Sequence, residues 1–244
     1  MSGNYADESL RFGAVFRKVV TGMGFRIRLG LVSVFALGGL LAATSVFAQA
    51  AAPDASTLKG DPVHGKAISY TCLGCHGIDG YRNAYPNYSV PKLTGQHPEY
   101  IVAALQEYKG NQRSHLTMHA QASELSDQDM VDIAAYFSGT VLTAGPAPAN
   151  APPAPAAVAV CAACHGATGI SVVPNYPNLA GQHADYLKRE IAEYKDGGRK
   201  NAIMSSMAAT IKDSDVEALA DYFSKMTPSL SVLHRPMTIL AAEH

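Results

Sequence analysis

The pentapeptide Cys-x-x-Cys-His occurs twice and constrains this chain more than any other feature. The two copies occupy residues 72–76 and 161–165, and together they use all four cysteines. This spacing is the attachment signal for c-type haem, in which both thiols bond to the porphyrin and the histidine ligates the iron. The sequence therefore predicts two covalently bound haem c groups, with covalent attachment and iron ligation by Cys72, Cys75, His76, Cys161, Cys164 and His165.

Three other interpretations of the cysteine pairs stay open on this observation alone. A thioredoxin-like redox pair needs no following histidine and normally follows a strand. A zinc site needs four ligands in closed tetrahedral geometry. A disulfide inside each motif is the third alternative. The histidine that follows both pairs favours haem attachment over all three.

The two motifs belong to two copies of a longer repeat. The segment Leu-Thr-Gly-Gln-His at 93–97 recurs as Leu-Ala-Gly-Gln-His at 179–183, 86 positions later. The motifs themselves are 89 positions apart, so the first copy has three extra residues between its motif and Pro91. Internal repetition of this kind indicates two homologous domains. The 86-residue offset also pairs Tyr100 with Tyr186, Tyr108 with Tyr194, Arg113 with Arg199, Met118 with Met204, Tyr136 with Tyr222 and Phe137 with Phe223.

Each copy predicts the same helical plan. A helix carries the haem motif, a loop without periodicity follows, and an amphipathic helix comes next, with apolar residues at helical spacing. A second loop carries a methionine, and a final helix has aspartates in its first turn, where the helix dipole favours them. No strand pattern is present, so the expected fold class is all-α. The predicted helices that follow the motifs are 98–109 and 127–138 in the first copy, and 184–195 and 213–225 in the second.

Composition divides the chain into five segments. Residues 1–50 are typical of a secretory signal peptide, because the uncharged stretch 29–48 is followed by a small-x-small cleavage site, and Met23 is a candidate for the true start. An uncleaved membrane anchor is the alternative, since about 20 apolar residues can span a bilayer. The other expected segments are a first domain at 51–142, an extended Pro/Ala-rich linker at 143–157, a second domain at 158–226 and a C-terminal tail at 227–244.

The charge balance argues against a nucleic-acid partner. The chain has 19 basic and 20 acidic side chains, and no run of lysine or arginine stands out. An export signal fits haem attachment, because bacteria attach haem c on the outer side of the cytoplasmic membrane. We therefore expect a periplasmic protein, with loose membrane association as an option.

The sixth iron ligand decides what each haem can do. A methionine thioether closes the iron site and raises its potential, whereas an open site suits catalysis or ligand sensing. The repeat register selects Met118 and Met204 as these ligands. Met207 is then expected to pack in the core, which is the usual role of a methionine, and His119 is the alternative ligand in the first copy.

Two further sets of paired residues have a structural and a catalytic interpretation. His97 and His183 each precede a predicted helix, so a structural place at the start of that helix competes with a distal catalytic role. The tyrosines that recur in register are expected to pack against haem or core rather than to carry radicals. This set is Tyr108, Tyr136, Tyr194 and Tyr222.

The chain resembles the dihaem cytochrome c4 family. The resemblance rests on Pro-Asn-Leu-Ala-Gly-Gln at 177–182, on Leu-Ser-Asp-Gln-Asp at 125–129 followed by Ile-Ala-Ala-Tyr-Phe at 133–137, and on the doubled haem motif. It implies two tandem class I cytochrome c domains related by a pseudo-twofold axis, each wrapped around one haem with His/Met ligation. It also implies that the carbonyls of Pro91 and Pro177 accept a hydrogen bond from the second ring nitrogen of each axial histidine.

The expected function is electron transfer rather than enzymatic catalysis. The resemblance implies a periplasmic carrier that takes electrons from a quinol-oxidising complex or another donor and passes them to a terminal haem-copper oxidase. A dihaem enzyme, such as a peroxidase, or a haem-based sensor is the alternative. The cluster of Lys195, Arg199 and Lys200 before Met204 is expected to dock an acidic partner, unless it is only a solvated loop.

Overall fold

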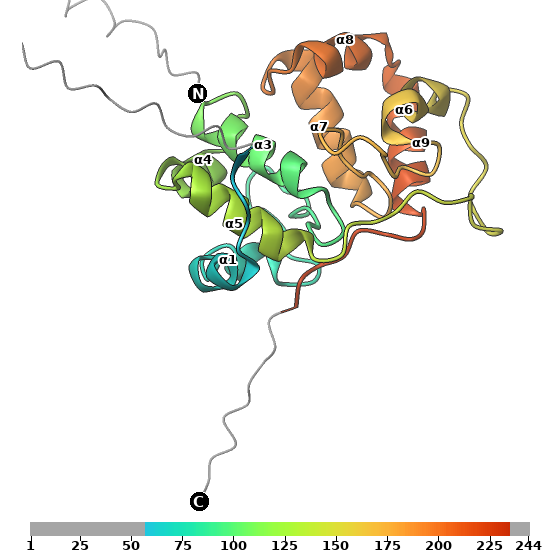
Figure 1. Cartoon of the computed structure of the whole chain (residues 1–244). Coiled ribbons are helices and arrows are strands. Elements are labelled where there is room, and N and C mark those ends of the chain that lie inside the picture. Colours follow the sequence, from blue (N-terminus) through green and yellow to red (C-terminus); the bar gives the residue numbers. More distant parts are fainter. Residues whose placement is uncertain (1–56, 235–244) are drawn as a thin grey trace, which may run out of the picture. The chain divides into compact units, whose positions relative to one another are not determined.

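The computed structural model describes residues 57–234, and this part of the chain is helical (Figure 1). It contains nine helices and no strand, apart from three isolated β-bridges. The expected all-α class is therefore confirmed. The expected signal peptide and the last ten residues of the tail lie outside the described residues. Within 57–234, no helix combines the length and the apolar character that crossing a membrane requires.

The first domain is built from five helices around one core. Helix α3 packs against α4 and α5, and α1 packs against α5. A capping box starts α5, in which the side chains of Ser126 and Asp129 each bond the other residue's backbone. The helices are α1 (Pro62–Ile68), α2 (Leu73–His76), α3 (Pro98–Lys109), α4 (Leu116–Ser123) and α5 (Asp127–Ser138). Their buried core includes Leu73, Ile101, Leu105, Met130, Ile133 and Phe137.

The second domain repeats this arrangement with four helices and its own core. Helix α7 packs against α8 and α9, as α3 packs against α4 and α5. The helices are α6 (Val158–His165), α7 (Ala184–Asp196), α8 (Ala202–Thr210) and α9 (Asp213–Ser224). The core includes Val158, Ile170, Leu187, Leu219, Phe223 and Met226. Two separate hydrophobic cores, one for each copy of the repeat, agree with the two-domain organisation.

The helices expected on either side of each methionine are present, but the methionines themselves do not lie in loops. Met118 lies in α4 and Met204 in α8. Each short helix begins at a capping side chain: His115 Nδ1 accepts from the Met118 N–H at 3.2 Å, and Asn201 Oδ1 accepts from the Met204 N–H at 3.1 Å. Because these caps satisfy N–H groups that a helix end leaves free, the segment folds as a helix despite its weak periodicity.

One of the contacts between the two domains is made twice. The Gln96 side-chain amide donates to Asn178 O at 3.0 Å and accepts from Asn178 N–H at 2.8 Å. The repeat-equivalent Gln182 forms the same pair of bonds with Lys92, both at 3.0 Å. Since Lys92 and Asn178 are themselves 86 positions apart, the junction follows the pseudo-twofold symmetry that the resemblance implied.

The tail after the second domain contacts both domains. The Leu230 N–H donates to Ala180 O at 2.8 Å in the second domain. Ser231 and Thr94 then exchange two backbone hydrogen bonds, at 3.0 and 3.1 Å, and Leu233 packs against the first core. The described part of the tail is therefore a strap between the domains, a role that no sequence signal predicts.

Candidate haem sites at the domain junction

Both haem motifs open onto one cavity of about 430 Å³. The first motif contributes Cys75 and His76 to its wall, and the second contributes Cys161, Cys164 and His165. Cys72 packs against the first core beside it. Most other wall positions are apolar, as a porphyrin requires; they include Ile101, Leu105, Leu187, Ile191, Leu219 and Phe223.

The two histidines of the motifs are held in the orientation that an iron ligand needs. His76 Nδ1 lies 3.1 Å from Pro91 O, and His165 Nδ1 lies 2.9 Å from Pro177 O. A carbonyl only accepts, so each Nδ1 carries the proton and each Nε2 keeps its lone pair. Burial lowers the pKa of both imidazoles, although the carbonyls act in the opposite direction, and this favours the neutral ligand form.

The candidate sixth ligands face the same cavity. Met118 from α4 and Met204 from α8 both belong to its wall. His119 does not, and its Nδ1 instead lies 2.8 Å from Tyr108 O. The expectation that Met207 packs in the core is wrong, because Met207 lies in the wall of the cavity and outside the buried core of the second domain. Met207, one turn after Met204 on α8, lies away from the core, because Ala208 is the residue of this helix that is buried there.

The paired histidines before α3 and α7 occupy structural positions. His97 and His183 are the residues immediately before these helices, and neither lines the cavity. His97 is buried, and its Nε2 lies 3.1 Å from Ser171 O in the other domain. This geometry favours the structural interpretation over a distal catalytic one.

The recurrent tyrosines pack as expected. Tyr108 and Tyr194 line the cavity. Tyr136 and Tyr222 each make an edge contact with the phenylalanine that follows them, at ring-centre distances of 5.4 and 5.1 Å.

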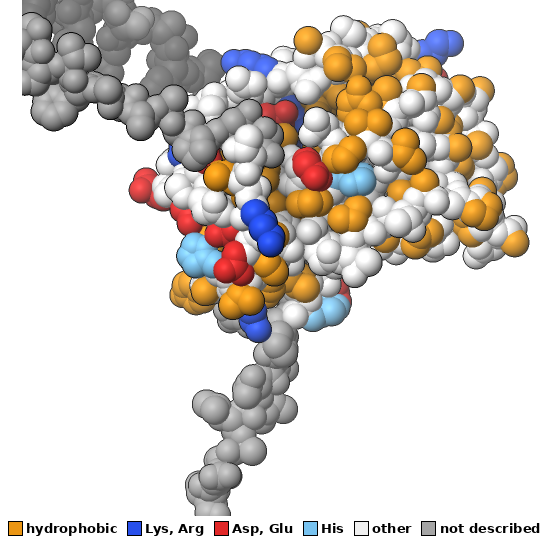
Figure 2. All heavy atoms as spheres, viewed as in Figure 1, with side chains coloured by type: hydrophobic (Ala, Val, Ile, Leu, Met, Phe, Trp, Pro, Cys, Tyr) orange, Lys and Arg blue, Asp and Glu red, His pale blue; other side chains and the backbone are white. Residues whose placement is uncertain are grey.

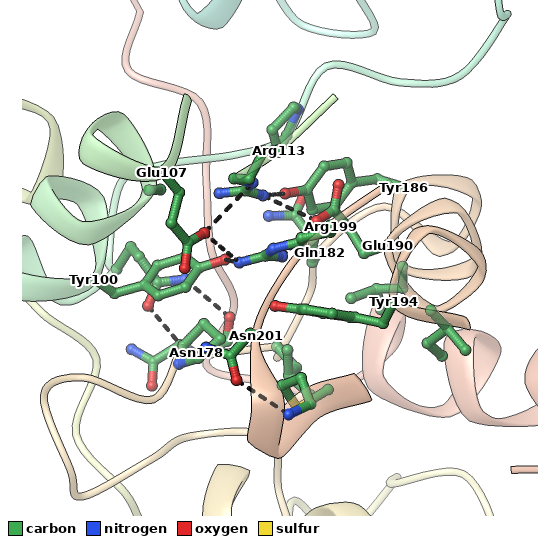
Figure 3. A pocket seen from close by; sticks show the side chains of 18 of the residues that line it. Tyr100, Glu107, Arg113, Asn178, Gln182, Tyr186, Glu190, Tyr194, Arg199 and Asn201 are labelled. Atoms are coloured by element: carbon green, nitrogen blue, oxygen red, sulfur yellow. Dashed lines mark hydrogen bonds and ion pairs between the residues drawn. The ribbon is translucent and has the colours of Figure 1, made fainter. Parts of the chain in front are cut away.

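Two arginines and two glutamates form a buried ion cluster between the haem motifs (Figure 3). Arg113 Nη2 lies 2.9 Å from Glu190, and Arg199 pairs with the same carboxylate and, at 3.3 Å, with Glu107. Each guanidinium also donates to a tyrosine hydroxyl at 3.2 Å, Arg113 to Tyr186 and Arg199 to Tyr100. We call Glu107, Arg113, Glu190 and Arg199 the junction ion cluster.

The environment of the junction ion cluster keeps Glu190 ionised. Burial alone would raise the pKa of Glu190, but Arg113 and Arg199 outweigh burial and hold that pKa below its ordinary value. The guanidiniums also stack on tyrosine rings, Arg113 over Tyr108 and Arg199 over Tyr194, both at 4.5 Å from the ring centre. The sequence signal for this cluster was the equal spacing of the paired arginines and tyrosines. Nothing in the sequence singled out Glu107 or Glu190.

The expectation of a basic docking loop before Met204 is wrong for Arg199. The Arg199 side chain is 5 % exposed and belongs to the junction ion cluster. Lys195 Nζ donates to Ile211 O and to Asp213, each at 2.6 Å, so it stabilises the turn between α8 and α9. A backbone bridge pairs Arg113 with Arg199 between the domains, and this pairing draws the loop inwards.

The donors and walls of the cavity fit haem. The buried Arg199 Nε has no hydrogen-bond partner among the described residues, and a haem carries carboxylates that can accept from it.

All four thiols are free, so neither motif forms a disulfide. In residues 57–234, no group of three His, Cys, Asp or Glu side chains is placed to hold a metal ion.

Comparisons with known proteins agree with this geometry. The family model described as cytochrome c matches residues 63–140 and 155–227. Cytochrome c4 of Pseudomonas aeruginosa is 34 % identical over 178 residues, covering 67 % of this chain and 87 % of the relative. A thiosulfate dehydrogenase electron acceptor of Thiomonas intermedia is 27 % identical, covering 84 % of this chain and 96 % of the relative.

A solved structure supports the same assignment. The crystal structure of reduced recombinant cytochrome c4 from Pseudomonas stutzeri matches with a TM-score of 0.54 and 31 % identity, covering 69 % of this chain and 100 % of that one. The repeat, the doubled haem motif and the shared cavity are thus found together with the family's sequence and fold. The chain belongs to the cytochrome c4 family of the cytochromes c, with two cytochrome c domains that each bind a covalent haem c.

Proposed function

We propose that the chain is an electron carrier that holds one electron at each of two haems, ligated by His76 and Met118 and by His165 and Met204. One observation carries this proposal: both histidines, with Nε2 free, and both methionines line the same cavity. When bound, a haem with two fixed protein ligands supplies a reversible one-electron change at its iron. Covalent attachment is assigned to Cys72, Cys75, Cys161 and Cys164.

The side chains around the cavity suit this role. The carbonyls of Pro91 and Pro177 fix the imidazole rings, so little has to rearrange when the charge of the site changes. The apolar wall excludes water, so less solvent has to reorient when an electron enters or leaves the haem. The junction ion cluster offers donors for haem carboxylates between the two sites.

We place this carrier in the periplasm, where it would take electrons from a quinol-oxidising complex or a comparable donor and deliver them to a terminal haem-copper oxidase. Residues 1–50 would direct export and be removed. The proposed domains are then 51–142 and 158–226, joined by 143–157 and followed by the tail at 227–244. Membership of the cytochrome c4 family supports the carrier role, and family members of this kind serve redox partners.

A second candidate differs in the electron donor. Two relatives are named thiosulfate dehydrogenase electron acceptors, and one of them covers more of this chain than the cytochromes c4 do. A solved thiosulfate dehydrogenase from Marichromatium purpuratum also matches, with a TM-score of 0.54 and 26 % identity. On this alternative the chain accepts electrons from a thiosulfate-oxidising enzyme, and the two haem sites work in the same way.

Spectroscopy of the oxidised holoprotein tests the carrier proposal. Two low-spin haems with methionine-to-iron absorption are expected, and the reduced protein should not bind carbon monoxide. A high-spin haem, or ready binding of carbon monoxide by the reduced protein, would instead favour a dihaem enzyme or a sensor. Reduction by a quinol-oxidising complex or by a thiosulfate dehydrogenase then separates the two candidate donors.

A further inference from the structure

The chain leaves the last helix of each domain in a segment that enters the other domain. After α5, residues 139–142 place Leu142 against the core of the second domain. After α9, the strap at residues 227–234 places Leu233 against the core of the first domain. We call residues 139–142 the linker arm, and the linker arm and the strap together the clasp. The two domains thus exchange one leucine each.

Both segments of the clasp pass the glycine of the repeated Gly-Gln-His segment. The Leu142 N–H donates to Gly95 O at 3.0 Å, and a Cβ at Gly95 would lie 2.9 Å from Leu142 Cγ. A Cβ at the equivalent Gly181 would lie 2.1 Å from Ser229 Cβ. Because glycine has no Cβ, each segment can approach the backbone closely here. In Figure 1 the linker arm (yellow-green) and the strap (red) cross between the domains in opposite directions.

Each segment of the clasp ends against the core that carries the other copy's haem motif. A Cβ at Gly77, the residue after His76, would lie 3.3 Å from Leu233 O. Leu73 of the same motif belongs to the core that Leu233 contacts. Cys161 of the second motif packs against the core that Leu142 contacts. The clasp therefore connects the scaffolds of the two haem sites to each other.

The clasp adds apolar contacts to a junction that otherwise consists of the hydrogen bonds and ion pairs described above. Hydrogen bonds between domains are replaced by hydrogen bonds to water when the domains separate, so their net contribution is small. Separation exposes Leu142 and Leu233 to water without such a replacement. Polar interfaces between domains of one chain allow relative motion by default. The clasp is therefore the part of the junction that resists opening.

The two leucines act on the same opening from opposite sides. While one of them holds, the other stays close to its core, so its contact is intramolecular and forms again readily. One leucine then keeps the domains together, and loss of both releases them. Leucines that stabilised only the nearest core would behave differently, because contributions to two separate cores add.

We propose that Leu142 and Leu233 are positioning residues, which hold the two haem sites in one mutual orientation and so set the rate of electron exchange between the haems. The inference rests on the proposed carrier function and adds the device that couples its two sites. One electron leaves the reduced site and enters the oxidised site, so the step needs no further reactant. Electron exchange falls steeply with separation, and it therefore takes place in the closed arrangement.

A double variant of the holoprotein, Leu142→Ala with Leu233→Ala, tests the proposal beside its two single variants. The control is Ile68→Ala with Val216→Ala. Ile68 and Val216 are also partly buried against the first and the second core, but each belongs to that core's own domain. None of these four residues lines the cavity between the haem motifs. The pair Leu142→Val with Leu233→Val makes the same test with smaller changes, should the alanine pair fail to fold.

The measurement is the rate of electron exchange in the half-reduced holoprotein, read from exchange between the haem methyl resonances. Each single variant should stay close to the wild-type rate. The double variant should be about tenfold slower if about a tenth of the molecules remain closed, and the control should keep the wild-type rate. Figure 2 shows apolar side chains spread over the second domain, so each rate is measured at several protein concentrations to separate exchange within one molecule from encounters between molecules.

Two results would overturn the proposal directly. One is an unchanged rate in the double variant, and the other is an equal loss in the control. A double variant that loses no more than the product of the two single losses would show that the segments act separately, and it would reject the clasp.

Two measurements on the oxidised holoprotein report orientation without electron transfer. The double variant should lose the Soret circular-dichroism couplet between the haems and gain radius of gyration in X-ray scattering, while the control keeps both. Slower exchange with an unchanged couplet and radius would mean that the leucines do not act through orientation, and would reject the proposal. A high-spin haem in the unmodified protein would instead refute the carrier function, and the couplet and the scattering would still decide whether the clasp orients the domains.

Discussion

Replacement of Arg199 by methionine should destabilise the protein strongly, because its side chain is buried between two carboxylates. The Arg199 side chain is 5 % exposed, pairs with Glu190 and Glu107, and donates to the Tyr100 hydroxyl. Methionine fills a comparable volume but removes the charge. Glu190 and Glu107 would then share Arg113 alone.

The magnitude follows from the geometry of these contacts. Removing one partner of a buried ion pair costs about 3–5 kcal/mol, because the other charge is left uncompensated. Glu190 keeps Arg113 at 2.9 Å, so the lower end of this range applies. We expect a loss of about 3 kcal/mol, which lowers the melting temperature by about 6–12 °C in a chain of this size.

Guanidinium unfolding of the holoprotein, followed by circular dichroism and haem absorbance together, measures this loss. Lys200→Met is the matched control, since Lys200 is adjacent but exposed, and it should change stability by less than about 0.5 kcal/mol. The double variant Arg199→Met with Glu190→Gln should lose less than the sum of the two single variants. A loss below about 1 kcal/mol for Arg199→Met, or strict additivity with Glu190→Gln, would refute the buried-pair argument.

Three further predictions address ligation, pH and the tail. Met118→Ala and Met204→Ala should each abolish the methionine-to-iron absorption of one haem and admit carbon monoxide, whereas Met207→Ala should leave both irons closed, as read from optical spectra. The hydrogen bond to the buried Asp132 raises the pKa of His64, so the stability that protonated His64 gives to α1 is fully present below about pH 6.5 and is lost as the pH rises through the raised pKa. The protection factors of the α1 amides, which are corrected for the intrinsic exchange rate at each pH, should therefore fall over that range in the wild type but not in His64→Gln. Gly181→Ala should detach the strap, because Gly181 has a φ of +70° and a Cβ there would lie 2.1 Å from Ser229 Cβ. The control is Gly80→Ala, since Gly80 has a similar φ of +68° but open space around it, so this change should cost only the backbone strain of about 1 kcal/mol. Thermal unfolding compares the stabilities of the two variants.

Each of these three predictions can fail in a defined way. Loss of the absorption in Met207→Ala, but not in Met204→Ala, would mean that the repeat register misplaces the second ligand. A pH response that persists in His64→Gln would assign the effect to another group near Asp132. Equal destabilisation by Gly181→Ala and Gly80→Ala would show that the contact with Ser229 contributes nothing.

Much of the candidate site could be predicted because its chemistry is local in sequence. The two haem motifs need only five consecutive residues each, since the thiols and the histidine must reach one porphyrin from one turn of chain. The helices at 98–109 and 127–138 were predicted at the bounds that the structure has, because apolar periodicity and a capping box are also local signals. The helical fold of the methionine segments was missed, although His115 and Asn201 are side chains that can cap a helix.

The tertiary structure decided the features that depend on two distant segments. Arg199 looks like a surface cation in the sequence, yet it is buried because the equivalent loops of the two domains pair with each other 86 positions apart. Met207 looks like a core residue, yet it lies in the wall of the cavity because Ala208 is the residue of α8 that is buried in the core. The sequence alone determined that two haems are attached and that the domains are copies. Only the packing of one copy against the other decided which charges are buried between the haems and which apolar residues remain outside.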